Sequence, residues 1–261
     1  MNRIWTHSIS SRIASIGGAR HLLICSDYDG TLAPIAARPE EARMLPNAFD
    51  LLNQLARLPK TRVAVVSGRS LEALRAHSKI DPPVLLVGSH GAELPGLASG
   101  GPDESKRMQL EKIESTISSM CASAPGVWIE RKPFGLTVHV RQASEPDACR
   151  VLRDLRQTFR TWPSVYQTEG KAVLELSLVR SHKGEAVNWL RRDWGTVPQV
   201  IYLGDDVTDE AAFGELGKND LGIKVGGGIT RATCRVSSEK VAVKVLSFLL
   251  RRRSLMSQSM K

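Results

Sequence analysis

The sequence contains no apolar run that approaches the roughly 20 residues of a membrane-spanning helix. Its first 20 residues also lack the continuous apolar stretch of a secretory signal, so we expect a loose leader with at most one short helix. The four cysteines are scattered without metal-ligand spacing and are interpreted as reduced thiols: Cys25, Cys121, Cys149 and Cys234. These absences predict a cytoplasmic protein with no membrane partner.

Aromatic and basic residues do not alternate in the pattern typical of proteins that bind single-stranded nucleic acid. The net charge is nevertheless +9, and a basic surface favours an anionic substrate or nucleic acid. Much of the excess lies on predicted solvated helix faces and in Arg251–Arg253, near the end of the chain. We therefore predict a monomer with a small anionic substrate and no nucleic-acid partner.

Apolar runs alternate with amphipathic helical segments in both halves of the chain. Buried strands are predicted at 22–25, 62–66, 84–87, 200–203 and 221–225. This alternation predicts an α/β fold with a parallel sheet and right-handed crossovers. A stretch rich in Gly, Pro and Ser at 94–103 interrupts the pattern. We expect residues 97–180 to form a separate α+β domain, inserted between the two parts of the core, 21–96 and 181–261.

Three of the predicted strands end in polar clusters. Asp27 and Asp29 follow the first strand, Ser67 follows the second, and Asp205 and Asp206 follow the fourth. Because the carboxyl ends of parallel strands meet at one edge of a sheet, we expect these groups to converge. Concentrated carboxylates repel one another without a cation, and hard oxygen ligands suit Mg²⁺. The simpler interpretation of the first cluster is an ordinary acidic turn.

These residues resemble the haloacid-dehalogenase-like phosphohydrolases. Four motifs of that superfamily occur in order: the DYDGTL segment at 27–32, Ser67 with Gly68 and Arg69, Lys183, and the GDDVTDE segment at 204–210. The resemblance implies a Rossmann-like parallel-sheet core with an inserted α+β cap domain of the larger, C2 type. Asp29 implies a phosphatase, since true dehalogenases lack the second aspartate of the first motif.

Within the superfamily, the chain is most similar to the trehalose-6-phosphate phosphatases, from about residue 21 to 250. The segments that carry the similarity are 67–69, 88–93, 170–176, 182–186 and 204–210. Two departures leave the sugar open: Ser89 stands where relatives often have Asn, and Ser177-Leu178 replaces Arg-Pro. The alternatives are a phosphatase of another sugar phosphate, such as sucrose phosphate or a phosphoglycerate adduct, a sugar phosphotransferase, and a non-catalytic sugar-phosphate-binding module.

The resemblance also implies a two-step phosphoryl transfer. Asp27 is the expected nucleophile, which forms an aspartyl-phosphate. Asp29 is expected to protonate the departing sugar oxygen and then to deprotonate the hydrolytic water. Ser67 and Lys183 are expected to hold the phosphoryl oxygens and to offset their charge.

A Mg²⁺ site accompanies this mechanism in the implied family. The expected ligands are the Asp27 carboxylate, the backbone carbonyl of Asp29, and Asp205. Asp206 and Asp209 are expected to orient bound waters and the lysine rather than to bind the metal directly.

Selectivity for the sugar is expected to come from the inserted domain. Its candidate residues lie on or beside predicted strands: Glu130, Lys132, Lys171 and Glu175. A solvated strand face is the alternative for each of them. Three residues at strand ends of the core are expected to contact phosphate or to close the cap: Arg69, His90 and Glu93. For His90, the alternative is a hydrogen bond that fixes its loop.

Overall fold

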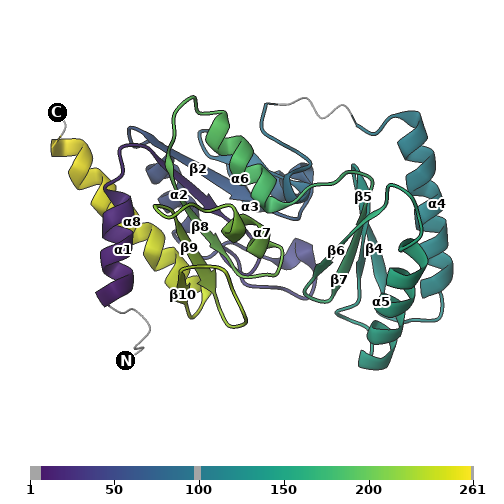
Figure 1. The fold of residues 1–261 in the computed structure, drawn as a ribbon. Helices are drawn as coiled ribbons and strands as arrows, with labels where there is room; N and C mark the ends of the chain where they lie inside the picture. Colours follow the sequence, from purple (N-terminus) through teal and green to yellow (C-terminus); the bar gives the residue numbers. More distant parts are fainter. Residues whose placement is uncertain (1–6, 97–100, 260–261) are drawn as a thin grey trace. The chain divides into compact units, whose positions relative to one another are not determined.

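The structure, a computed structural model, describes residues 7–96 and 101–259 (Figure 1). The chain divides into two compact units, Met1–Pro95 with His182–Lys261, and Gly96–Ser181. We call the first the parallel-sheet unit and the second the insert. Residues 1–6 of the predicted leader and 97–100 of the predicted inserted domain lie outside the described residues.

The parallel-sheet unit is built on six strands in the order β10-β9-β8-β1-β2-β3. Their bounds are β1 Leu22–Ser26, β2 Thr61–Val66, β3 Leu85–Val87, β8 Gln199–Gly204, β9 Leu221–Val225 and β10 Cys234–Val236. All neighbouring strands pair in parallel, with Ile24 of β1 opposite Val63 of β2 and Ile201 of β8. Both faces of the sheet are buried, which explains why the strands are continuous apolar runs. The sequence did not predict β10, which has only three residues.

Helices cover both faces of this sheet. The elements are α1 His7–Gly17, η1 Pro39–Glu41, α2 Ala48–Ala56, α3 Leu71–Ser78, η2 Ser89–Gly91, α6 Lys183–Arg192, α7 Asp209–Gly214 and α8 Glu239–Ser259. One buried cluster joins alternate strand residues to α1, α2 and α8, and a second joins the intervening residues to α6 and α7. The two clusters therefore pack against the central strand β1 from both sides.

Helix α1 corrects the prediction of a loose leader for its described part. Ile9, Ile13 and Ile16 are buried in the core of the parallel-sheet unit, and the helix packs beside α8 (Figure 1). Three isoleucines spaced by four and three residues form an apolar stripe on one helix face. Such a stripe contains no continuous apolar run, so the absence of a run from the first 20 residues does not indicate a loose segment.

Arg253, one of the three arginines near the end of the chain, is a structural residue of the parallel-sheet unit. Its side chain is only 4% exposed. The guanidinium donates hydrogen bonds to the carbonyls of Ala19 and Lys60 and to the hydroxyl of Thr61. Arg253 therefore ties α8 to the segments before β1 and β2.

The insert is an antiparallel sheet with two helices on one face. Its elements are α4 Glu104–Cys121, β4 Trp128–Lys132, β5 Gly135–His139, α5 Glu145–Phe159, β6 Tyr166–Gly170 and β7 Val173–Ser177, with the strand order β4-β5-β7-β6. Apolar residues of β5 and β7 pack against both helices, and polar residues occupy the other face. The sequence did not predict β6, whose residues Tyr-Gln-Thr-Glu-Gly show no apolar alternation. Among all described residues, no helix is long and apolar enough to cross a membrane.

Candidate active site

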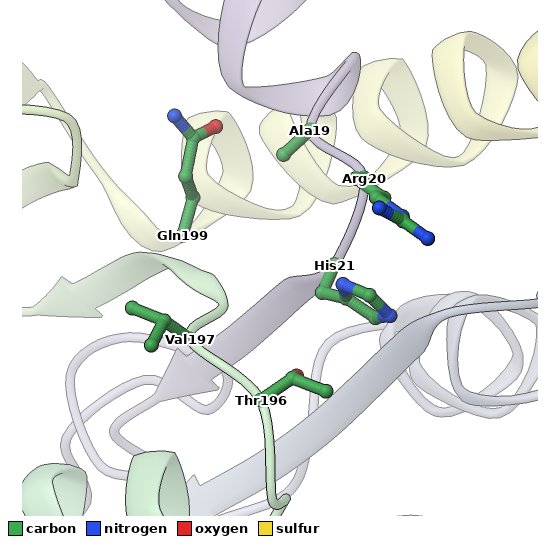
Figure 2. A pocket seen from close by; sticks show the side chains of 6 residues that line it. All are labelled: Ala19, Arg20, His21, Thr196, Val197 and Gln199. Atoms are coloured by element: carbon green, nitrogen blue, oxygen red, sulfur yellow. The ribbon is translucent and has the colours of Figure 1, made fainter.

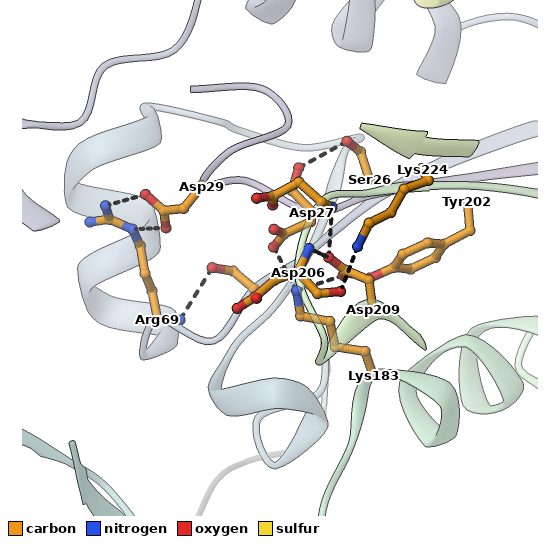
Figure 3. A network of polar contacts seen from close by, with 11 residues as sticks. Ser26, Asp27, Asp29, Arg69, Lys183, Tyr202, Asp206, Asp209 and Lys224 are labelled. Carbon is orange, nitrogen blue, oxygen red and sulfur yellow. Dashed lines mark hydrogen bonds and ion pairs between the residues drawn. The ribbon is translucent and has the colours of Figure 1, made fainter. Parts of the chain in front are cut away.

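Asp27 lies directly after β1, at the carboxyl edge of the parallel sheet. Its backbone N–H donates to the carbonyl of Leu203 in β8 at 2.9 Å, so the residue is held by the sheet although it lies beyond the strand. Lys183, the first residue of α6, places its Nζ 2.8 Å from Asp27 Oδ1 and 2.7 Å from Asp209 Oδ1 (Figure 3). All three side chains are buried. A carboxylate and an ammonium therefore meet where chemistry is expected in an open α/β sheet.

Asp209 orients this cluster. The hydroxyl of Tyr202 donates to Asp209 Oδ1 at 2.8 Å, and the backbone N–H groups of Asp205 and Asp206 both donate to Oδ2 at 2.9 Å. Gly204 makes room for it, since a Cβ there would lie 2.3 Å from Asp209 Cγ. Both oxygens of Asp209 are thus engaged in holding Lys183, Tyr202 and the loop after β8.

The charges of the cluster shift its pKa values. Burial raises the pKa of Asp27 well above its ordinary value, and the carboxylates of Asp209 and Asp205 add to this, although Lys183 opposes it. Burial also opposes the ionisation of Asp209, but the Lys183 ammonium and several hydrogen bonds hold its pKa below the ordinary value. For Lys183, burial would lower the pKa, and the two neighbouring carboxylates raise it instead. Lys183 pairs with Asp27 and Asp209, and a third carboxylate, Asp205, lies in the same group, so the cluster favours an additional cation.

The residues present fit a hard divalent cation. Oxygen atoms of Asp27, Asp205 and Asp209 all lie within 4.8 Å of one another. Asp205 lies over Gly30, whose φ is +79° and where a Cβ would come within 2.2 Å of Asp205 Oδ2. Glycine at this turn therefore leaves the space in which the carboxylates converge, and carboxylate oxygens are the donors that Mg²⁺ or Ca²⁺ takes. The carboxylates of Asp29 and Asp206 are not part of this group among the described residues.

The Asp29 side chain points away from the Asp27 cluster and toward Arg69 (Figure 3). Arg69 Nε lies 2.7 Å from Asp29 Oδ2, and Nη2 lies 2.7 Å from Oδ1. Nη2 also donates to the carbonyl of Pro39 at 2.7 Å, and the Arg69 side chain is only 6% exposed. A bidentate ion pair therefore occupies both oxygens of the residue expected to act as acid and base.

Ser67 and His90 come together at the ends of β2 and β3. Ser67 Oγ accepts from the backbone N–H of Arg69 at 3.2 Å, and the backbone N–H of His90 donates to the carbonyl of Ser67 at 2.9 Å. The His90 ring lies against Gly68, where a Cβ would come within 2.6 Å of it. Glu93 fixes its own loop and α3, because its Oε2 accepts from Ser89 Oγ at 2.6 Å and from the backbone N–H of Leu71 at 3.0 Å.

Three of the four residues predicted to recognise the sugar lie together on the polar face of the insert sheet. Glu130 and Lys132 are on β4, and Glu175 is on β7. The Lys132 ammonium pairs with Glu175, whose Oε2 also accepts from the Thr137 hydroxyl at 3.3 Å. Lys171 is exposed in the two-residue turn between β6 and β7, at one end of the sheet.

A cavity of about 570 Å³ lies elsewhere in the parallel-sheet unit (Figure 2). Its lining residues precede β1 and β8 or, in the case of Gln199, begin β8: Ala19, Arg20, His21, Thr196, Val197 and Gln199. These positions are at the amino ends of the strands, at the edge opposite Asp27. The cavity is therefore not part of the carboxylate cluster.

Comparison with known proteins identifies the family. The model of the family described as trehalose-phosphatase matches residues 25–247. The chain belongs to the trehalose-phosphatase family.

Relatives and solved structures agree with this membership. The chain is 28% identical to trehalose-phosphate phosphatase B of Arabidopsis thaliana over 82% of its own length and 61% of that protein. It is 34% identical to the trehalose-phosphate phosphatase of Mycobacterium avium over 77% of its own length and 54% of that protein. The chain therefore spans little more than half the length of these relatives.

The fold class predicted from the sequence is confirmed. The trehalose-6-phosphate phosphatase C-terminal domain of Candida albicans superimposes with a TM-score of 0.79 at 24% identity, over 92% of this chain and 96% of that one. The two structures share the fold of a parallel-sheet core with a separate antiparallel sheet.

Sequence reasoning missed several polar residues that complete both clusters of this trehalose-phosphatase family member. Tyr202 bonds Asp209 in the parallel-sheet unit, and Thr137 and His139 bond Glu175 and Glu130 in the insert. A signal for Thr137 and His139 was available, because they alternate with Leu136 and Val138 along β5. Tyr202 lies within a buried apolar run, where only its lone hydroxyl signals a polar partner.

Proposed function

We propose that this chain is a Mg²⁺-dependent phosphatase that hydrolyses trehalose 6-phosphate to trehalose and phosphate. The observation that carries the proposal is the meeting of Asp27, Lys183 and Asp205 at the carboxyl edge of the sheet. In this proposal the parallel-sheet unit is the catalytic core and the insert is the cap. We further propose that the protein acts as a monomer in the cytoplasm.

Asp27 performs the first bond change. One of its carboxylate oxygens attacks phosphorus, forming a P–O bond to the enzyme as the bond from phosphorus to the sugar oxygen breaks. Lys183, 2.8 Å from Asp27 Oδ1, and the Ser67 hydroxyl hold the phosphoryl oxygens. Their charge and hydrogen bond stabilise the negative charge of the transition state without reorganisation during the reaction.

Asp29 moves the protons. It gives a proton to the departing sugar oxygen, and as a carboxylate it then takes a proton from the water that attacks phosphorus. The second attack breaks the P–O bond to Asp27 and releases phosphate. Because both Asp29 oxygens are held by Arg69, Asp29 has to leave this guanidinium in order to protonate the sugar. An anionic phosphate gives Arg69 another partner, which agrees with a substrate contact for Arg69.

Mg²⁺ would be held by the Asp27 carboxylate, the backbone carbonyl of Asp29, and Asp205, with Asp206 and Asp209 as neighbouring groups. When bound, the cation neutralises carboxylate and phosphoryl charge. Asp27 needs this cation because burial and the other two carboxylates raise its pKa. A nucleophile must be ionised, and a second positive charge beside Lys183 favours the ionised form.

In this proposal, the polar face of the insert determines the selectivity for the sugar. Its contacts are assigned to Glu130, Lys132, Lys171 and Glu175, with Arg69, His90 and Glu93 of the parallel-sheet unit near the phosphate. Glu130 and Glu175 can each accept hydrogen bonds from sugar hydroxyls, and sites that lose such a partner discriminate strongly. The bonds of Glu93 to Ser89 and to the start of α3 favour a supporting role for that residue.

A phosphatase of another sugar phosphate is the nearest alternative, because the phosphate and metal chemistry would be unchanged. Ser89 and the Ser177-Leu178 pair depart from the family pattern and keep this alternative open. A sugar phosphotransferase would use the same nucleophile. A non-catalytic binding module is disfavoured, since it needs neither a nucleophile such as Asp27 nor an acid and base such as Asp29.

The test is phosphate release from a panel of phosphomonoesters with Mg²⁺ and with excess EDTA. The panel contains trehalose 6-phosphate, sucrose 6-phosphate, glucose 6-phosphate and p-nitrophenyl phosphate. We expect trehalose 6-phosphate to have the largest kcat/KM and EDTA to abolish release from every substrate. A different preferred sugar would replace trehalose in the proposal, and activity in EDTA would contradict the metal assignment.

A further inference from the structure

His139 lies on the same face of the insert sheet as Glu130. It is on β5 directly opposite Trp128 of β4, and Glu130 is the next residue of that face along β4. Such diagonal neighbours on adjacent strands are close enough for long side chains to interact. The His139 side chain is 13% exposed and that of Glu130 is 22% exposed, so the carboxylate is the more accessible of the two.

Two contacts fix the imidazole ring of His139. The ring stacks on Trp128 with a centroid separation of 3.8 Å and an interplanar angle of 1°. Its Nε2 lies 2.8 Å from Glu130 Oε2. The stacking sets the plane of the ring and the hydrogen bond sets its direction within that plane, so neither ring nor carboxylate can rotate without losing a contact.

The proton of this hydrogen bond belongs to His139. Burial opposes the ionisation of Glu130, but the hydrogen bond from His139 and the charge of Lys132 hold its pKa below the ordinary value. An ionised carboxylate only accepts, so Nε2 carries the hydrogen and donates it. Oε2 is thereby engaged, whereas Oε1 has no hydrogen-bond partner among the described residues.

Glu175 is held differently. Lys132 and Thr137 both bond its Oε2, and its side chain is 9% exposed.

We infer that His139 is a positioning residue for sugar specificity: it holds Glu130 in one orientation so that Oε1 accepts a hydrogen bond from a sugar hydroxyl. This inference rests on the proposed function. It means that His139 orients Glu130, whereas Lys132 and Thr137 orient Glu175.

Two substitutions separate the hydrogen bond from the stacking. His139→Phe keeps a flat ring against Trp128 but removes the donor, whereas His139→Gln can place an amide N–H near the position of Nε2. With trehalose 6-phosphate we expect His139→Phe to raise KM about tenfold, with kcat changed less than about twofold, because a contact made equally in ground and transition states is weakened. His139→Gln is expected to remain within about threefold of the wild type. His77→Phe, at a half-buried histidine of α3, controls for the change of side chain.

A double-mutant cycle with Glu130→Gln tests whether the effect passes through Glu130. In that background we expect His139→Phe to change KM by less than about twofold, since the orientation of the carboxylate no longer matters. Equal KM values for the wild type and His139→Phe, equal losses in the Phe and Gln variants, or additive losses in the cycle would each overturn the inference. A wild-type protein that releases no phosphate from trehalose 6-phosphate would overturn the proposed function and this inference with it. An active wild type with an unaffected His139→Phe variant would overturn the inference alone.

Discussion

The parallel-sheet unit and the insert each contain a buried lysine that pairs with carboxylates, but their charge balance differs. In the parallel-sheet unit, Lys183 pairs with Asp27 and Asp209, and Asp205 lies within the same group. In the insert, Lys132 pairs with Glu175, and Glu130 has a separate partner in His139. The first cluster gathers three carboxylates around Lys183, whereas in the second each of the two carboxylates has its own side-chain donor.

This difference indicates what each cluster can recognise. Excess carboxylate charge attracts a cation, and a cation beside Lys183 attracts phosphate, which is the same in every phosphomonoester. Carboxylates that each have a donor of their own attract a metal less and instead offer directional hydrogen bonds to hydroxyl groups. Substitutions in the parallel-sheet cluster should therefore affect all substrates, and those in the insert should affect only the sugar phosphate.

The largest effect is expected from Asp27→Asn. Loss of the nucleophile should reduce phosphate release from trehalose 6-phosphate and from p-nitrophenyl phosphate alike, by on the order of 10⁴-fold or more. Initial rates with both substrates at saturating Mg²⁺ measure this. A variant with near wild-type rates on either substrate would exclude Asp27 as the nucleophile.

The same variant should keep its fold without metal, which its melting curve in EDTA can show. The pKa of Asp27 is higher in the folded protein than in the unfolded chain. The protonated group therefore contributes its full stability below the unfolded pKa, and this contribution is lost as the pH rises through the folded pKa. At neutral pH burial of this ionisable group therefore costs the metal-free wild type stability, a cost that the asparagine lacks. We expect the variant to melt at the same temperature as the wild type or higher.

The next effect concerns the cation. Asp205→Ala should reduce activity toward both substrates by on the order of 10³-fold, since one of few fixed oxygen ligands is removed. Mg²⁺ at 100 times its dissociation constant should stabilise the wild type by about 2.7 kcal/mol, and the variant should lose this gain. Thermal melts with and without Mg²⁺ measure it, with Asp154→Ala on α5 as a control at an exposed carboxylate. A full Mg²⁺ shift in Asp205→Ala would remove Asp205 from the metal site.

Part of this arrangement was predictable from the sequence. The apolar runs before Asp27, Ser67 and Asp205 predicted strands, and parallel pairing of β1 with β2 and β8 brings their ends together. Convergence was therefore predictable from strand ends alone. In the insert, Glu175 and Ser177 are two positions apart, so on a strand they share a face, as they do on β7.

Other features depend on contacts between residues far apart in the chain. No local pattern indicates that Arg69, 40 positions after Asp29, holds both oxygens of that carboxylate. The burial of α1 depends on a face offered by α8 at the other end of the chain. Strand β6 is polar because it is an edge strand beside β7, so no local pattern marked it.

A smaller and more selective effect is expected in the insert. Glu175→Ala should lower kcat/KM for trehalose 6-phosphate by on the order of 10²-fold, because a carboxylate that accepts sugar hydroxyls is lost. Hydrolysis of p-nitrophenyl phosphate should be almost unchanged, since this substrate has no sugar. Removal of the partner of Lys132 also costs stability, so Glu175→Gln is measured beside it, with a melting curve for each. Equal losses on both substrates would mean that Glu175 supports the fold instead.

The smallest effects come from two hydroxyls that each donate to a carboxylate of one cluster. Tyr202→Phe removes the 2.8 Å bond to Asp209, and Thr137→Val removes the 3.3 Å bond to Glu175 while keeping the branched shape of the side chain. The shorter bond should be worth more: we expect about a tenfold loss of kcat/KM for Tyr202→Phe and about a threefold loss for Thr137→Val. Because Asp209 orients Lys183, the first loss should be equal for trehalose 6-phosphate and p-nitrophenyl phosphate. Because Glu175 belongs to the insert, the second loss should appear with trehalose 6-phosphate only. If Thr137→Val slowed both substrates equally, or Tyr202→Phe slowed the sugar phosphate alone, phosphate chemistry and sugar recognition would not be divided between the two units.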